Sequence, residues 1–108
     1  MPLVTISAAE HAAEETLLRA VADAVADALG LGDGDVIALA TPVRSMVASG
    51  RDGAAGPWPI ATIHGSDRGE QPMRAALAAA EQAMLDWGRD QRVEIEGVWV
   101  EWALPLTR

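Results

Sequence analysis

The chain has 108 residues, half of them hydrophobic, and no cysteine, which predicts a single domain over residues 1–108 without disulfides, thiolate metal sites or cysteine nucleophiles. Its formal net charge of −8 argues against nucleic acid and against an anionic membrane surface as partners. No stretch is apolar for long enough to span a bilayer, and no basic segment precedes an apolar one, so we expect a cytoplasmic protein.

The first half of the chain has the pattern of a strand, a helix and a strand. Residues 3–7 are apolar and β-branched, which predicts a short strand, and Ser7-Ala8-Ala9-Glu10 has the pattern of a capping box at a helix start. Apolar residues then recur four apart, which predicts a helix buried along Leu17, Val21, Val25 and Leu29. Gly30 ends this helix, and residues 35–41 predict a second strand.

The second half has the same order of elements. Residues 60–64 predict a strand, and a helix follows in which Pro72 is tolerated because it falls in the first turn. The expected buried stripe of this helix is Met73, Leu77, Ala80, Met84 and Trp87. Gly88 is expected to end the helix, and residues 93–102 predict the last strand, with Gly97 at a bulge or bend.

The two halves are a repeat. Pro2-Leu3-Val4-Thr5-Ile6 returns 57 residues later as Pro59-Ile60-Ala61-Thr62-Ile63. The chain therefore divides into two β-α-β units, at about 2–41 and about 59–103, joined by a linker over 42–58 that is rich in glycine and proline. Parallel pairing within each unit predicts an α/β (α+β) fold with one four-stranded mixed sheet and two helices on one face. The other face of the sheet would be open, which predicts an oligomer.

Pro2 carries the strongest chemical hypothesis. Removal of Met1, which is expected for a Met-Pro start, would expose a secondary amine held rigidly by its strand. Apolar surroundings disfavour the charged form and lower the amine pKa below its ordinary ~7.7–8.0, which suits a general base at neutral pH. The alternative is that Pro2 only starts the strand, a place where proline is tolerated. Pro59, the equivalent residue, is internal and has no free amine.

This arrangement resembles the tautomerase superfamily, whose members use an amino-terminal proline and β-α-β units. Residues Pro59–His64 are similar to the opening of a 4-oxalocrotonate tautomerase subunit, and Gly30–Ala40 to the helix end and second strand of macrophage migration inhibitory factor. Ile63-His64-Gly65 with Arg68, and Val98-Trp99-Val100, are similar to segments of cis-3-chloroacrylic acid dehalogenase. The resemblance covers nearly the whole chain and implies a fused, two-unit member that assembles as a homotrimer.

The resemblance implies that Pro2 is the catalytic amine and that Arg68, just before the second helix, binds the carboxylate of a small substrate. At five positions the chain lacks an active-site residue of its relatives. Ala12 and Gln71 stand in place of two arginines, Leu29 in place of a histidine, Leu31 in place of a lysine and Glu101 in place of a tyrosine. No single characterised activity therefore transfers intact.

Five further residues are candidates for the site. Glu101 either activates water near the proline or pairs with an arginine of a neighbouring subunit. His64 is either an acid or base or a hydrogen-bonded core or interface residue, and His11 either donates to a substrate carboxylate or lies on the surface. Trp58 is placed to line or cover a pocket, and Arg44 to reach an active site across a subunit boundary. Two isolated histidines have no ligand spacing, so we expect no metal site.

Three functions follow from these residues. The first is an isomerase without a cofactor, in which Pro2 transfers a proton between the keto and enol forms of a small 2-oxo acid and Arg68 anchors the carboxylate. The second is a hydratase, dehalogenase or decarboxylase of an unsaturated acid, with Pro2 as acid and Glu101 activating water. The third is a catalytically degenerate trimer kept for binding or structure.

Overall fold

The structure is a computed structural model and describes residues 1–105. Its elements, in chain order, are β1 (Leu3–Ala8), α1 (Glu14–Leu29), β2 (Ile37–Pro42), β3 (Ile60–His64), α2 (Glu70–Asp90) and β4 (Trp99–Ala103). The sheet order is β2-β1-β3-β4, with β1 parallel to β2, β3 parallel to β4, and β1 antiparallel to β3. The predicted α+β fold with one four-stranded mixed sheet is confirmed.

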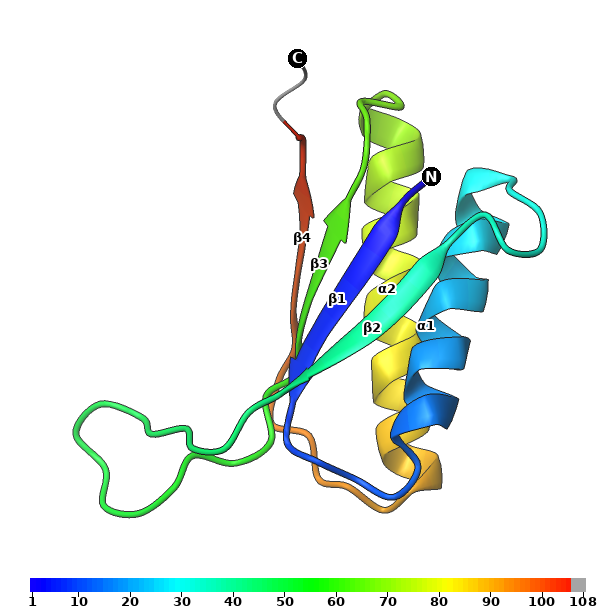
Figure 1. Ribbon diagram of the computed structural model, residues 1–108. Helices are drawn as coiled ribbons and strands as arrows, with labels where there is room; N and C mark the ends of the chain where they lie inside the picture. The colour runs from blue at the N-terminus through cyan, green and yellow to red at the C-terminus, as the bar shows by residue number, and fades with distance from the viewer. Residues whose placement is uncertain (106–108) are drawn as a thin grey trace.

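Both helices cover the same face of the sheet (Figure 1). Side chains alternate along a strand, so every second residue of the central strands points toward the helices. These residues and the apolar stripes of both helices form one core, whose most buried members are Val4, Ile6, Ala61, Ile63, Leu17, Val21, Val25, Ala76, Ala80, Met84 and Trp87. The repeat seen in the sequence is therefore a repeat of core positions.

The antiparallel pairing of β1 with β3 gives the sheet two different ends. Leu3 lies opposite His64 at the end that carries Pro2, which we call the proline end. The C-terminal end of α1 and the start of α2 lie at this end too (Figure 1). Ser7 lies opposite Ile60 at the other end, from which the linker projects, and which we call the linker end.

The predicted capping box is wrong, because Ser7 is part of β1 and α1 begins only at Glu14. Ala13 precedes the helix without a side-chain cap, and its backbone N–H donates to Nδ1 of His11 at 2.9 Å. The predicted end of this helix is confirmed. Gly30 follows it in the left-handed conformation, with a φ of 68°, which glycine adopts without steric cost.

The last strand is shorter than predicted, and α2 does not end at Gly88 but continues through it. Gly88 is buried in the helix, and Ile95 packs directly against it. The backbone N–H of Glu96 donates to the carbonyl of Pro57 at 2.9 Å, so this part of the chain binds the linker before β4 begins to pair with β3. The segment 93–98 therefore forms a wall of the linker end.

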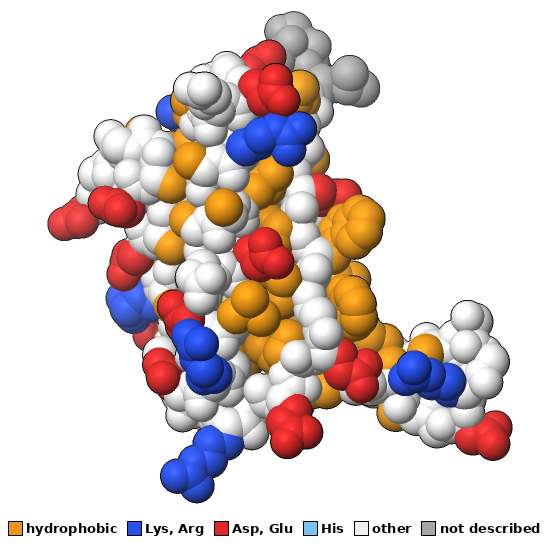
Figure 2. Space-filling view, turned by 180° about the vertical axis from the view of Figure 1, so that it is seen from behind, with side chains coloured by type: hydrophobic (Ala, Val, Ile, Leu, Met, Phe, Trp, Pro, Cys, Tyr) orange, Lys and Arg blue, Asp and Glu red, His pale blue; other side chains and the backbone are white. Residues whose placement is uncertain are grey.

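Hydrophobic side chains gather on the side of the molecule where β4 lies, whereas charged side chains are spread over the helices (Figure 2). On the sheet face that no helix covers, Ile37 is 47%, Leu39 40% and Trp99 59% exposed. Apolar area of this kind supports the formation of an oligomer. In the part of the chain that the structure describes, neither helix has the length and apolar character needed to cross a membrane.

Candidate active site

Pro2 lies directly before β1, one of the two central strands of the sheet. Its side chain is less than 2% exposed, and its carbonyl accepts a hydrogen bond of 3.2 Å from the backbone N–H of Ile37. Met1, which is bonded to the proline nitrogen, is by contrast 78% exposed. The core and the sheet thus fix the ring of Pro2, while the residue bonded to its nitrogen lies at the surface.

Arg68 lies at the proline end, in the connection between β3 and α2. Its backbone N–H donates to the sulfur of Met73 at 3.3 Å, and its side chain is partly buried. Among residues 1–105, the guanidinium Nε of Arg68 is a buried donor without a hydrogen-bond partner. A buried unsatisfied donor costs about 1–3 kcal/mol, so an anion bound beside Arg68 would remove an existing penalty. The neighbouring carboxylate of Asp67 accepts instead from the backbone N–H of Gly69 at 2.8 Å.

Glu101 lies on the uncovered face of β4, where it accepts a hydrogen bond of 3.2 Å from the indole Nε1 of Trp99. Strand β4 is two positions away from β1, and a spacing of ~4.8 Å per strand puts Glu101 at least about 10 Å from β1. Within one chain, Glu101 does not reach Pro2. His64, at the end of β3, is exposed on the same face, so it is not a core residue of the single chain, whereas its expected role at an interface stays a prediction.

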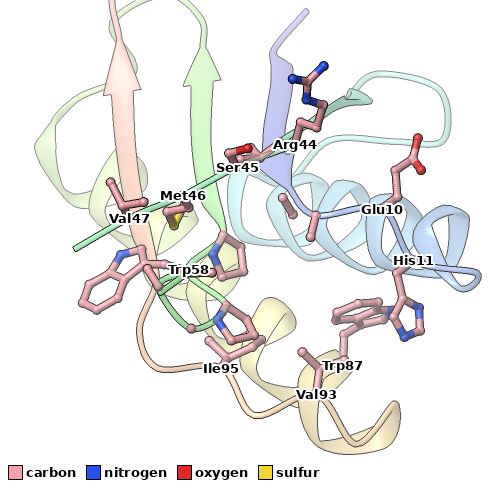
Figure 3. Close-up of a pocket in the computed structure, with 18 residues that line it drawn as sticks. Glu10, His11, Arg44, Ser45, Met46, Val47, Trp58, Trp87, Val93 and Ile95 are labelled. Atoms are coloured by element: carbon pink, nitrogen blue, oxygen red, sulfur yellow. The ribbon is translucent and has the colours of Figure 1, made fainter. Parts of the chain in front are cut away.

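The other three candidates meet at the linker end. His11, Arg44 and Trp58 line a cavity of about 490 Å³ (Figure 3). The six residues of β1 separate this cavity from Pro2, a distance of about 20 Å at ~3.3 Å per residue. The structure therefore brings these three residues together, but within one chain it does not bring them to Pro2.

Two aromatic contacts shape this cavity. The ring of His11 meets that of Trp87 edge to face, with centroids 4.9 Å apart, and Nε1 of Trp87 donates to the carbonyl of Ala13 at 3.1 Å. Trp58 lies against Gly97, where a Cβ atom would come within 2.6 Å of the indole ring. Sequence reasoning placed Trp87 only in the core and Gly97 only at a bulge. Neither the helical spacing of Trp87 nor the glycine at 97 reveals a contact with a residue so distant in the chain.

The ion pairs of the described region lie on the helix surfaces, and neither Arg44 nor Arg68 takes part in one of them. They join Arg19 to Glu15, Arg74 to Glu70, and Arg89 to Asp86. Over residues 1–105, no group of three or more histidine or acidic side chains is arranged to hold a metal ion. Arg68 thus keeps its charge available for a ligand at the proline end.

No family model matches the sequence, and no curated protein matches it. Solved structures do match. Pt0534 inactivated by 2-oxo-3-pentynoate superposes with a TM-score of 0.77 at 20% identity, over 95% of this chain and 85% of that chain. A fused 4-OT, a symmetric trimer, matches with a TM-score of 0.70 at 21% identity over the same shares. Malonate semialdehyde decarboxylase matches with a TM-score of 0.65 at 19% identity, over 95% of this chain and 84% of that chain.

These structures belong to the tautomerase superfamily, and the chain has the fold of that superfamily. The resemblance seen in the sequence is thereby confirmed at the level of the fold. At these identities the likeness does not decide between the reactions that the superfamily performs.

Proposed function

We propose that this chain is a tautomerase-superfamily isomerase that moves a proton between the keto and enol forms of a small 2-oxo acid. The nitrogen of Pro2, freed by removal of Met1, acts as the general base, and Arg68 binds the substrate carboxylate. The solved structures of the same fold are enzymes of this superfamily, which supports an enzymatic role.

The observation that carries the proposal is the contrast between Pro2 and Met1. The proline ring is buried and its carbonyl is tied to β2, whereas Met1 is exposed. Loss of Met1 would leave a secondary amine at the surface with no conformational freedom of its own. A neighbouring copy that covers this end in the homotrimer proposed below would exclude water and disfavour the protonated form, which would leave the amine neutral and ready to take a proton near pH 7.

Arg68 supplies the charge that such a substrate requires. It lies at the proline end, close in sequence to the start of α2, and its buried Nε has no partner in the described region. A carboxylate would accept from this donor and would also gain from the helix N-terminus. The same positive charge would stabilise the negative charge that develops on the conjugated oxygen during proton transfer.

We further propose that the chain is a fused, two-unit member of the superfamily that works as a homotrimer. The uncovered sheet face with Ile37, Leu39 and Trp99 supports this assembly, as does the symmetric trimer of the fused 4-OT. Glu101, and the cavity residues His11, Arg44 and Trp58, would act at Pro2 only when a neighbouring copy presents them.

Hydration or decarboxylation of an unsaturated acid is the second candidate, with Pro2 as acid and Glu101 activating water. The exposed carboxylate of Glu101, held by Trp99, is the observation that favours it. A reaction rate that is highest below the pKa of the proline, and that is lost in Glu101→Gln, would distinguish this reaction from isomerisation.

The test compares three variants with the natural protein, using phenylenolpyruvate and 2-hydroxymuconate as substrates. An alanine inserted between Met1 and Pro2 turns the nitrogen into an amide, and Pro2→Ala replaces the rigid secondary amine. Pro59→Ala is the matched control, because Pro59 holds the equivalent position before β3 without a free amine.

We expect kcat to fall at least ~100-fold with the insertion, whereas Pro59→Ala stays close to the natural rate. Intact mass of the natural protein should show that Met1 is absent. Unchanged rates after the insertion would contradict the proposal, and retained Met1 without activity would favour the third alternative, a binding or structural trimer.

A further inference from the structure

We infer that Trp102 is a positioning residue, whose indole holds the connection between β3 and α2 in the place where Arg68 can bind a carboxylate. This inference deepens the proposed function and rests on its assignment of Arg68 as the carboxylate anchor. Trp102 lies on β4, opposite Ile63 of the parallel strand β3. Because the two strands are parallel, the end of β4 and the connection that follows β3 lie at the same end of the sheet, the proline end (Figure 1).

Gly65, the first residue of this connection, is bound to β4 through both of its backbone polar groups. Nε1 of Trp102 donates to the carbonyl of Gly65 at 3.2 Å, and the N–H of Gly65 donates to the carbonyl of Ala103 at 3.2 Å. Gly65 is buried, and a Cβ atom there would come within 3.0 Å of the indole ring of Trp102. The indole therefore fixes the point at which the connection leaves the sheet.

The rest of the connection is short and internally bonded, so it carries a displacement of Gly65 onward to Arg68. Residues 66–69 separate Gly65 from the start of α2. Within this span the carboxylate of Asp67 accepts from a backbone N–H at 2.8 Å, and the N–H of Arg68 donates at 3.3 Å to the sulfur of Met73 in the first turn of α2. The backbone of Arg68 is thus held from the helix on one side and from β4 on the other.

This placement matters because a charge-assisted hydrogen bond depends on distance and direction. In the described region the Nε of Arg68 is a buried donor without a partner, so a carboxylate must meet it where it lies. Trp102 packs against the hydrophobic core and is itself partly buried, which keeps its N–H in one place. Loss of that N–H would leave the carbonyl of Gly65 without this partner and would loosen the connection. We expect weaker binding of a carboxylate to follow.

The test measures the Kd of 2-oxobutanoate, a small 2-oxo acid, by isothermal titration calorimetry. Trp102→Phe keeps an aromatic ring and deletes the N–H. Val100→Ala is the matched control, because Val100 lies on the same strand, packs against the same core and has no side-chain donor for Gly65. Gly65→Ala is a second variant, which keeps the indole N–H but crowds the ring.

A ¹H–¹⁵N spectrum adds a measurement that needs no ligand. The four tryptophans give four indole N–H signals, which Trp→Phe variants assign, and the Nε–H signal of Arg68 is assigned by its loss in Arg68→Met. If Trp102 positions Arg68, the Nε–H signal of Arg68 moves in Trp102→Phe and stays in place in Val100→Ala. A general loss of stability in β4 would move it in both variants or in neither.

We expect Trp102→Phe to raise the Kd ~3–10-fold, Gly65→Ala to raise it at least ~2-fold, and Val100→Ala to change it less than ~2-fold. Added to Arg68→Met, Trp102→Phe should have no further effect, because Trp102 acts through Arg68.

An unchanged Kd or an unmoved Arg68 signal in Trp102→Phe would overturn the inference, and so would an equal loss of binding with and without Arg68. A natural protein that does not bind the acid would overturn it as well. If rates still depend on Pro2 in these cases, the proposed function stands without the inference. The expected pattern of binding in a protein without turnover would support the inference and contradict the proposed function.

Discussion

Leu3 of β1 and His64 of β3 lie directly opposite each other in antiparallel register. This pairing places Pro2, one residue before Leu3, at the same end of the sheet as Arg68, four residues after His64. The proposed base and the proposed anchor come from different β-α-β units, so the duplicated architecture is what brings them to one end. The candidates in the linker and before α1 are carried to the opposite end by the same topology.

Replacing Arg68 by methionine removes the charge and keeps much of the length of the side chain. We expect KM for a 2-oxo acid substrate to rise ~10–100-fold, because a charge-assisted contact is worth about 1.5–3 kcal/mol. Arg74→Met is the control, since Arg74 is exposed and pairs with Glu70 at 2.9 Å on the surface of α2. Steady-state kinetics that respond equally to both changes would remove Arg68 from the site.

Trp87→Phe keeps an aromatic ring in the core and deletes the indole N–H. The carbonyl of Ala13 then loses its partner, and we expect the free energy of unfolding to fall by about 1–2 kcal/mol. Trp99→Phe alters a side chain that is 59% exposed, so this substitution should change the free energy of unfolding by less than about 0.5 kcal/mol. Urea denaturation followed by circular dichroism measures both. A Trp87 variant as stable as the natural protein would show that this bond does not stabilise the fold.

Gly97→Ala should displace Trp58, because the new Cβ atom would lie 2.6 Å from the indole ring. Trp58 is 43% exposed and can turn outward, so we expect the stability to change by no more than about 1 kcal/mol, while the indole signal of Trp58 moves. Gly32→Ala is the control, where the nearest atom is at an ordinary 3.5 Å. An unmoved Trp58 signal in Gly97→Ala would mean that the contact with Gly97 is absent in solution.

Leu39→Glu tests the uncovered sheet face. In the proposed oligomer, a charge on this face should separate the copies, because the carboxylate would be buried without a partner. Ala75→Glu, on the exposed side of α2, should leave the mass in solution unchanged. Light scattering that finds the same mass for Leu39→Glu as for the natural protein would place the interface elsewhere.

The sequence was sufficient for the fold because its signals were local and periodic. The spacing of Leu17, Val21 and Val25 predicted the buried face of α1, and Gly30 predicted its end. The capping box at Ser7 failed because pairing with β3 extends β1 through that residue, an interaction that no local pattern reports.

The candidate site was predicted less completely than the fold, because part of it also depends on interactions that no local pattern reports. Pro2 and Arg68 were each singled out by their position, and the structure puts them at one end of the sheet. The cavity depends on contacts between residues far apart in the chain, such as His11 with Trp87 and Trp58 with Gly97. Spacing along one helix or strand carries no information about such pairs.

The central claim is that Pro2 bears a neutral amine at neutral pH, and titration of that amine tests it most directly. Protein labelled with ¹⁵N-proline gives one amine nitrogen, whose chemical shift against pH yields its pKa. We predict a pKa below the ordinary ~7.7–8.0 of an α-amino group, with activity rising as pH passes upward through it, because the neutral form is the base. A pKa at or above that range, or a proline nitrogen that remains an amide because Met1 is retained, would contradict the account.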